Sequence, residues 1–214
     1  DLRGIVNGID YDVFNPETDP DIVQNYNAKN FRKEKVKNKR ALQEELGLAK
    51  DDKKFMIGIV SRLTNQKGLD LIQCVMDEIC TDDVQLVVLG TGDENYENMF
   101  RHYDWKYHDR VSAQIYYSEP LSHKIYAACD AFLMPSLFEP CGLSQLMALR
   151  YGTVPIVRET GGLKDTVWPY NEFEGTGTGF SFANYNAHEM LNIIRYAKHI
   201  YYDKKREWNK IVDR

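Results

Sequence analysis

The most constraining feature of this sequence is a regular alternation of short apolar runs with longer stretches of helical periodicity. The runs are β-rich and almost continuously apolar, as strands buried on both faces of a sheet are. Strands are predicted over residues 55–60, 84–89, 111–117, 131–134 and 154–157. Helices are predicted over residues 69–79, 94–102, 121–129 and 143–151. This alternation predicts an α/β fold, a Rossmann-like doubly wound parallel sheet with helices on both faces.

The two flanks depart from this pattern. Residues 10–30 are rich in Asp, Asn and Pro and are predicted to form a long loop. Residues 32–46 carry six basic side chains ahead of two leucines. We interpret this run as a solvated helix face, with an anionic-ligand patch as the alternative. Apolar residues return at helical spacing from residue 186, and Trp208 and Ile211 extend that spacing.

Composition narrows the class of protein. The sequence has 214 residues, of which 43% are hydrophobic and 28% charged, so wholesale disorder is not expected. A net charge of −5 argues against nucleic acid or an anionic membrane as a general partner. No apolar run approaches the ~18 residues that span a bilayer, and the N-terminus lacks a signal-peptide pattern. The sequence starts at Asp1 and soon reaches an apolar pair, so we expect it to be a piece of a longer protein.

The cysteines show no metal-ligand spacing, so no metal site is predicted from them. Buried, reduced thiols in a cytoplasmic protein are the expected state. The four residues are Cys74, Cys80, Cys129 and Cys141.

Ligands of such sheets bind at the carboxyl ends of the strands, so the loops there are where chemistry is expected. The first strand ends in residues 61–68, where Arg62 and Lys67 lie five positions apart ahead of a helix. Two cations so placed can converge on one anion, helped by the N–H groups of the helix. The alternative is two exposed cations on a loop. The segment is not a P-loop, because the glycine and lysine spacing differs.

The next two loops carry weaker signals. Gly90 and Gly92 let the backbone approach a ligand closely, but a lone Gly-x-Gly also serves any tight turn. Tyr117, at the end of the third predicted strand, is suited to stack on a flat base. A core or surface tyrosine is the alternative interpretation.

The last two loops combine a carboxylate with glycines. Glu139 precedes a helix whose first turn holds Gly142, and the free amides of that turn seek an acceptor. Alternatively, Glu139 caps the helix electrostatically. Gly161 and Gly162 present backbone N–H groups ahead of the next helix. The later glycine-rich segment, residues 175–179, is interpreted as a flexible turn. Together these loops predict a site for an anion or a polyol.

Three motifs in these loops are similar to those of the bacterial glycogen synthase and plant starch synthase family. They are Ser61-Arg62-Leu63 with Gln66-Lys67-Gly68, the segment 138–143 (FEPCGL) and the segment 160–167 (TGGLKDTV). Residues 6–10 and 14–16 resemble the interdomain crossover of that family. The resemblance extends from about residue 5 to residue 208. It implies a GT-B fold of two Rossmann-like domains, of which this chain is the C-terminal half. Residues 1–30 would be the crossover and loop, and residues 31–214 the nucleotide-sugar-binding domain, with the N-terminal acceptor domain absent.

The resemblance also implies an activity. The family transfers glucose from ADP-glucose to the non-reducing end of an α-1,4-glucan, with retention of configuration, in glycogen biosynthesis. The implied partners are ADP-glucose or ADP, the glucan acceptor and the chain's own N-terminal domain. No cofactor and no metal are implied, and the location is the bacterial cytoplasm. The fragment is expected to be inactive alone. The alternatives are a related retaining GT-B enzyme that uses UDP- or GDP-sugars, and a non-catalytic glucan-binding module.

The same resemblance assigns roles to residues. It implies that Arg62 and Lys67 bind the diphosphate and stabilise departing ADP, and that Glu139 lies against the glucose hydroxyls as a positioning group. It implies backbone contacts to sugar and phosphate for Cys141, Gly142 and Leu143. It implies contacts to the distal phosphate for Thr160, Gly161 and Gly162. Tyr117 and Gly92 are implied to contact the adenine nucleoside. Met147 stands where many retaining GT-B enzymes have a second glutamate, so the ribose contact of that glutamate is absent.

Overall fold

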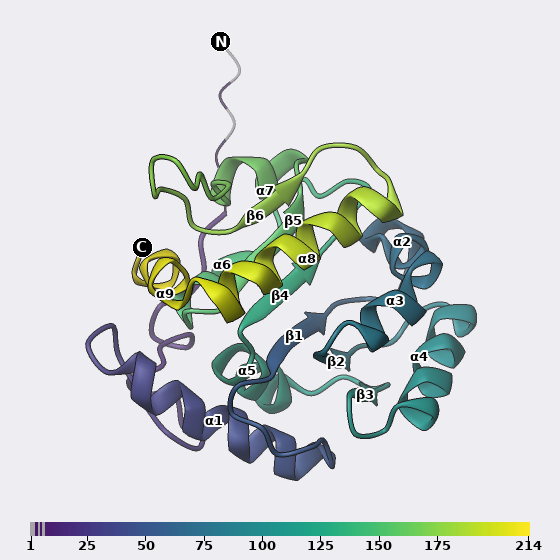
Figure 1. Cartoon of the computed structure of the whole chain (residues 1–214), viewed down its shortest axis with the longest axis horizontal. Helices are drawn as coiled ribbons and strands as arrows, with labels where there is room; N and C mark the ends of the chain where they lie inside the picture. Colours follow the sequence, from purple (N-terminus) through teal and green to yellow (C-terminus); the bar gives the residue numbers. More distant parts are fainter. Residues whose placement is uncertain (1–2, 4, 6) are drawn as a thin grey trace.

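The centre of the molecule is one parallel sheet with strand order β3-β2-β1-β4-β5-β6 (Figure 1). The computed structural model describes residues 3, 5 and 7–214. The strands are β1 (Phe55–Val60), β2 (Val84–Leu89), β3 (Val111–Gln114), β4 (Ala131–Met134), β5 (Val154–Arg158) and β6 (Phe180–Phe182). Strands β2 and β3 lie on one side of β1 and β4 on the other, so the order reverses between β1 and β4. The predicted doubly wound, Rossmann-like sheet is confirmed.

Helices cover both faces of this sheet. They are α1 (Phe31–Leu46), the short 3₁₀ helix η1 (Asn65–Lys67), α2 (Leu69–Cys74), α3 (Met76–Thr81), α4 (Glu94–Lys106), α5 (Glu119–Ala128), α6 (Ser144–Arg150), α7 (Gly161–Thr166), α8 (Ala187–Asp203) and α9 (Lys205–Asp213). One core cluster joins alternate strand residues to α2, α3, α4, α8 and α9. The other alternate residues pack on α1, α5, α6 and α7. Figure 1 shows α8 crossing in front of the sheet.

Local sequence signals start two of the helices, α5 and α8. Ser118 accepts a hydrogen bond from the N–H of Leu121, and Pro120 lies in the first turn of α5. The Asn186 side chain accepts from the N–H groups of His188 and Glu189 at the start of α8. These caps satisfy N–H groups that have no partner inside a helix.

The structure differs from the predicted elements in several places. The helix expected over residues 69–79 breaks at Val75, whose dihedrals are φ −120° and ψ 19°, and forms α2 and α3. The third strand ends at Gln114 rather than at residue 117. The C-terminal helix divides at Lys204, with φ −130° and ψ 55°, into α8 and α9. Strand β6 was not predicted, because its three residues follow a glycine-rich turn and pair only with β5.

The glycine-rich segment 175–179 is a turn, as predicted, and hydrogen bonds hold it. The N–H of Gly175 donates to the carbonyl of Asn171 at 2.8 Å, and that of Tyr170 donates to Gly179 at 2.8 Å. The turn therefore closes a short hairpin beside β6.

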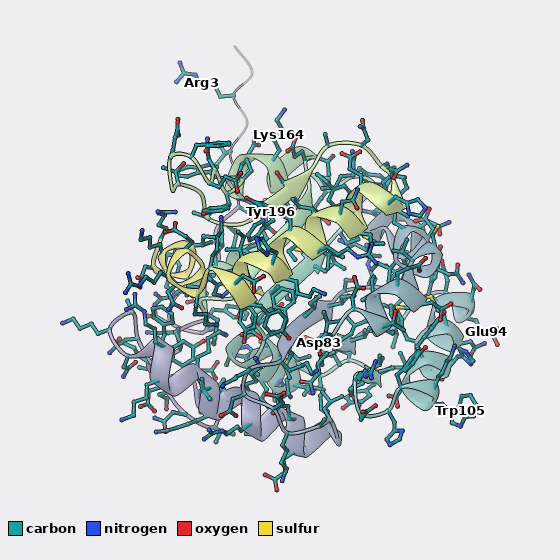
Figure 2. The ribbon with its side chains drawn as sticks, viewed as in Figure 1. Arg3, Asp83, Glu94, Trp105, Lys164 and Tyr196 are labelled. Atoms are coloured by element: carbon teal, nitrogen blue, oxygen red, sulfur yellow. The ribbon has the colours of Figure 1, made fainter. Side chains whose placement is uncertain are left out.

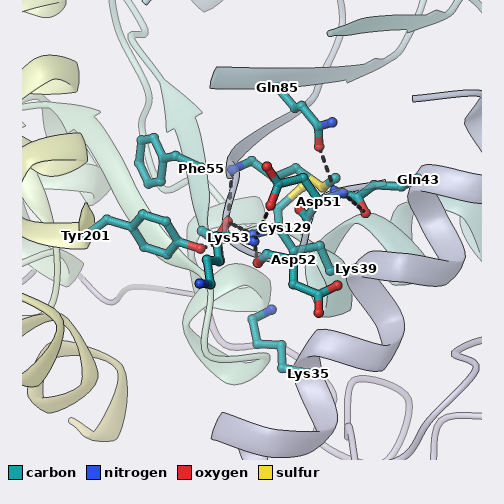
Figure 3. Close-up of polar contacts among 12 residues, drawn as sticks. Lys35, Lys39, Gln43, Asp51, Asp52, Lys53, Phe55, Gln85, Cys129 and Tyr201 are labelled. Atoms are coloured by element: carbon teal, nitrogen blue, oxygen red, sulfur yellow. Dashed lines mark hydrogen bonds and ion pairs between the residues drawn. The ribbon is translucent and has the colours of Figure 1, made fainter. Parts of the chain in front are cut away.

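The interpretation of the basic run as a solvated face is wrong for two of its six cations. Lys39 is 3% exposed, and its Nζ lies 2.7 Å from Asp130 Oδ2 (Figure 3). Lys35 Nζ donates to the carbonyls of Tyr126 at 3.0 Å and Ala127 at 2.7 Å. Those carbonyls lie in the last turn of α5, where no helical partner exists, so α1 supplies the donor. The other four cations of the run are exposed, as predicted.

The cysteine expectation holds in part. Cys80 and Cys129 are buried, Cys141 is half-buried and Cys74 is exposed; all four are free. Cys74 lies on the outward side of a one-and-a-half-turn helix that ends directly after it, which explains its exposure. In the part of the chain that the structure describes, no helix is long and apolar enough to cross a membrane.

Residues 10–30 form the predicted long loop, which packs on the sheet domain. Asp19, 2% exposed, accepts a hydrogen bond from the Tyr151 hydroxyl, and its Oδ2 lies 2.6 Å from His123 Nδ1. Tyr26 donates its hydroxyl to the carbonyl of Tyr151. Residues 1, 2, 4 and 6 of the predicted crossover lie outside the described residues.

Candidate functional site

The structure brings the predicted cations and the predicted carboxylate together at the carboxyl ends of β1 and β4. Lys67, at the end of η1, places its Nζ 2.7 Å from Glu139 Oε2. Their side chains are 18% and 9% exposed, so the pair is largely shielded from water. The Ser136 hydroxyl also donates to Glu139 at 3.4 Å. This position is the point where the strand order reverses, at which ligands of such sheets bind.

A cavity of about 210 Å³ opens at the same place. Arg62 and Lys67 line it from the β1 side, and Pro135, Ser136 and Ser144 line it from the β4 side. Lys164, a further cation near the glycines of α7, points into solvent instead (Figure 2). The cavity is therefore lined by two of the cations that the sequence singled out.

Two larger cavities lie elsewhere. One of about 800 Å³ adjoins the loop of residues 7–31, and one of about 450 Å³ lies between α1 and α9. Neither contains Arg62 or Lys67, both of which line the smaller cavity. We take the smaller cavity as the candidate site. Its position at the switch point of the sheet and the two cations in its lining indicate a ligand site more strongly than a large volume does.

The loop that carries Glu139 (residues 135–143, the Glu139 loop) abuts the turn before α7 (residues 159–162, the Gly161 turn). The N–H of Gly162 donates to the carbonyl of Glu139 at 3.0 Å. A Cβ on Gly161 would lie 2.0 Å from that carbonyl oxygen, and a Cβ on Gly162 would lie 1.9 Å from the Cys141 oxygen. The consecutive glycines thus allow two loops to touch, a packing role that the sequence analysis did not identify.

The remaining residues predicted on these loops stand close by. Gly142 has φ +69°, a left-handed conformation that favours glycine. Cys141 Sγ accepts a hydrogen bond from the N–H of Asn7 at 3.2 Å, which ties the first described residues to the Glu139 loop. Leu143 is 41% exposed, and Thr160 is the residue before α7.

The predicted nucleoside side is more open. Gly92 pairs with Leu63, and a Cβ on Gly92 would lie 2.3 Å from the Leu63 oxygen, so the Gly-x-Gly turn packs against the Arg62 loop. The N–H of Gly92 donates to Glu97 Oε2 at 3.0 Å. Tyr117 follows β3 at the sheet edge and is 84% exposed, which rules out the core alternative. Its role in base stacking stays a prediction.

Two supporting residues were missed from the sequence. Arg158 Nε donates to the carbonyl of Ser136 at 2.8 Å, and Gln145 Nε2 donates to the carbonyls of Cys141 and Gly142 at 3.1 and 2.9 Å. Both support the Glu139 loop from behind. Neither the burial of Gln145 nor its backbone partners can be known from the sequence, so no sequence signal identified it.

Among the described residues, one cluster has the spacing of metal ligands, namely Asp19, Asp21 and His123. It lies where the loop of residues 10–30 packs on α5, and Asp19 Oδ2 is already bonded to His123 and Tyr151. It includes none of the residues predicted for donor binding.

Comparison with known proteins agrees with this architecture. The family model described as "Glycosyl transferases group 1" matches residues 42–211. The glycogen synthase of Lachnospira eligens is 79% identical over all of this chain and 45% of its own length. That of Lachnoclostridium phytofermentans is 76% identical over the same shares. The chain therefore spans less than half the length of these curated relatives.

Solved structures show the same fold. The catalytic domain of starch synthase IV from Arabidopsis thaliana, bound to ADP and acarbose, has a TM-score of 0.91 and 36% identity, covering 98% of this chain and 44% of that one. Anabaena HepE in complex with UDP-glucose has a TM-score of 0.68 at 21% identity, covering 97% of this chain and 49% of that one. The latter likeness is one of fold alone.

Proposed function

The chain belongs to the glycosyl transferases group 1 family, and on that premise we propose that it is the donor-binding half of a glycogen synthase. In this proposal the complete protein transfers glucose from ADP-glucose to the non-reducing end of an α-1,4-glucan, with retention of configuration. Residues 31–214 form the nucleotide-sugar-binding domain, and residues 1–30 are the crossover from an N-terminal domain that completes the cleft.

One observation carries the proposal most directly: Lys67 and Glu139 meet at the switch point of the sheet, beside a cavity that Arg62 also lines. A nucleotide sugar presents a diphosphate next to a polyol, so it needs cations beside a hydrogen-bond acceptor. This cluster offers both within one ion pair. A site for neutral sugar alone would not need two converging cations.

The geometry suggests how the residues would act. With no donor bound, Lys67 is neutralised by Glu139. A diphosphate entering the cavity would compete for Lys67, and the carboxylate would then be free to accept hydrogen bonds from the glucose hydroxyls. Arg62 and Lys67 would neutralise the charge that develops on departing ADP. Glu139 is a positioning group in this scheme, and the incoming glucan hydroxyl would lose its proton to the leaving phosphate.

The remaining contacts complete the proposed donor site. The main chain at Cys141, Gly142 and Leu143 would face sugar and phosphate. Thr160 and Gly161 would face the distal phosphate. The N–H of Gly162 already donates to the carbonyl of Glu139, so Gly162 would only pack beside the phosphate. Tyr117 and Gly92 would flank the adenine nucleoside. The scheme requires no metal and no cofactor, and it places the protein in the bacterial cytoplasm with its glucan acceptor.

A nucleotide panel tests the proposal. The chain is incubated with ADP, UDP or GDP, and separately with a maltooligosaccharide, and its melting temperature is measured. We expect ADP to raise the melting temperature most. A larger shift with UDP or GDP would favour a related transferase with another donor. A shift with the maltooligosaccharide alone would favour a non-catalytic glucan-binding module.

A further inference from the structure

The side chain of Gln145 joins the two loops on which donor binding is proposed to depend. Its Nε2 donates to the carbonyls of Cys141 at 3.1 Å and Gly142 at 2.9 Å, both in the Glu139 loop. The same nitrogen lies 3.1 Å from Thr166 Oγ1, in the helix that follows the Gly161 turn. Thr166 Oγ1 in turn donates to the carbonyl of Gly162 at 2.6 Å. One buried amide thus spans both loops through a continuous chain of hydrogen bonds.

This amide is fully buried, but within the described part of the chain its oxygen lacks a hydrogen-bond partner that would offset the loss of water. Gln145 is 0% exposed, and its Oε1 has no hydrogen-bond partner among the described residues. The three acceptors around Nε2 fix which end of the amide faces the loops. A buried amide oxygen without a donor is unfavourable. The favourable polar contacts of this side chain are therefore those made by its nitrogen.

The space around Gly142 depends on the same side chain. A Cβ on Gly142 would lie 2.6 Å from Gln145 Oε1 and 3.0 Å from Glu139 Cγ. The Gln145 amide and the Glu139 side chain therefore both lie beside Gly142, in the space that a side chain at this position would need.

We infer that Gln145 is a positioning residue that holds the Glu139 loop in register with the Gly161 turn, so that the sugar and the distal phosphate of one donor are contacted together. The inference rests on the proposed function. Arg62 and Lys67, the proposed cations for the diphosphate, come from the loop after β1, and no hydrogen bond from Gln145 to that loop is found among the described residues. Loss of the Gln145 bonds should therefore leave the cation contacts of ADP intact, weaken only the contact with its distal phosphate, and impair transfer more than it impairs ADP binding.

The test compares Gln145→Met with Gln85→Met. Gln85 is an equally buried glutamine, 0% exposed, whose Nε2 donates to the carbonyl of Ala49 at 2.8 Å and whose Oε1 accepts from Gln43 at 2.9 Å. It lies in β2 at the start of the strand, at the opposite edge from the site. Both substitutions remove buried amide bonds at similar volume, so the control accounts for any general loss of stability.

Two measurements distinguish the variants. In this chain, hydrogen exchange of the amides of residues 139, 141–143 and 160–166 should accelerate about tenfold in Gln145→Met and stay unchanged in Gln85→Met. In the two-domain protein, kcat with ADP-glucose should fall about 10- to 100-fold in Gln145→Met only, while the Kd for ADP stays within about threefold. Thr166→Val, which removes the bridging hydroxyl, should give a smaller change in the same direction and serves if Gln145→Met does not fold.

Equal exchange and equal kcat in Gln145→Met and Gln85→Met would overturn the inference, as would a loss of ADP affinity as large as the loss of kcat. Failure of the unsubstituted two-domain protein to transfer glucose from ADP-glucose would instead contradict the proposed function. The hydrogen-exchange comparison would still decide whether Gln145 couples the two loops.

Discussion

At the scale of single residues, substituting Lys67 and substituting Glu139 should have opposite effects on ADP binding. Both side chains are largely shielded, so removing one partner leaves the other charged and poorly solvated. Removing Lys67 leaves the Glu139 carboxylate unpaired and also removes a contact with phosphate. Removing Glu139 leaves Lys67 free for the phosphate of the proposed donor.

Replacing Lys67 by alanine should weaken ADP binding. A charge-assisted contact contributes about 1.5–3 kcal/mol, so we expect a loss of roughly ten- to a hundredfold in affinity. Isothermal titration calorimetry measures it, with Lys210→Ala as the control because Lys210 is exposed on α9 and, among the described residues, pairs only with Glu207. Unchanged ADP affinity in Lys67→Ala would contradict the phosphate assignment.

Replacing Glu139 by glutamine should have the opposite effect on ADP. The amide keeps the shape of the side chain but no longer holds Lys67 in an ion pair, so ADP should bind about three- to tenfold more tightly, on the order of 1 kcal/mol. Glucose transfer by the two-domain protein should fall, because the carboxylate no longer accepts from the sugar. If ADP binds more weakly to Glu139→Gln, the ion pair is not what the diphosphate displaces.

Single residues also show where sequence reasoning ends. Arg62, Lys67 and Glu139 could be found because each follows a recognisable strand, and parallel strands bring such loops to one edge. Lys35 and Lys39 could not, because a basic run looks the same whether it faces water or the carbonyls of another helix. Gln145 was missed for a similar reason: its partners are backbone atoms of a loop whose course the sequence does not specify.

At the scale of elements, α1 is attached to α5 through a half-buried cation. Lys35 Nζ donates to two carbonyls of the last turn of α5 and to Thr153 Oγ1 at 2.9 Å. Burial lowers the pKa of Lys35 from its ordinary 10.5 to about 7. Between these two values the unfolded chain binds a proton that the folded chain does not, so stability rises with pH in that window.

The free energy of unfolding should therefore rise measurably with pH. From pH 7 to pH 8.5, Lys35 should add about 1.5 kcal/mol to the free energy of unfolding. Urea denaturation at both pH values measures it, and Lys35→Met should lose that increment while Lys37→Met, an exposed neighbour on α1, keeps it. The range stops at pH 8.5 because burial raises the pKa of Cys80 to about 12, which reverses the sign once unfolded thiols ionise. A slope that is the same in all three proteins would show that Lys35 is not desolvated.

The elements themselves were predictable in proportion to their apolar periodicity. Strands β1, β2 and β4 are apolar except for Gly58 and Gln85, and they match their predicted bounds. Strand β6 has three residues and follows a hydrogen-bonded hairpin, so only pairing with β5 defines it. The breaks at Val75 and Lys204 could not be predicted, because the apolar residues keep helical spacing across both positions. Packing on the sheet decides where the backbone turns.

At the scale of the whole molecule, the loop of residues 10–30 belongs mechanically to the sheet domain. Its Asp19 is buried against His123 and Tyr151, and the ring of Phe14 stacks on His123 with centroids 4.8 Å apart. Arg150 Nε also donates to the carbonyl of Phe14 at 3.0 Å. These contacts fix the loop to α5 and α6.

This arrangement separates donor binding from transfer. The predicted donor contacts, from Arg62 to Gly162, lie on loops of this one domain, so the chain alone should bind ADP. Transfer also requires that the acceptor hydroxyl be held and water be kept out, which one face of an open sheet edge does not provide. We therefore expect calorimetry to detect ADP binding to the chain, and labelled ADP-glucose to yield no glucan elongation. Adding the domain that completes the cleft should restore elongation, whereas elongation by the chain alone would contradict the division of labour.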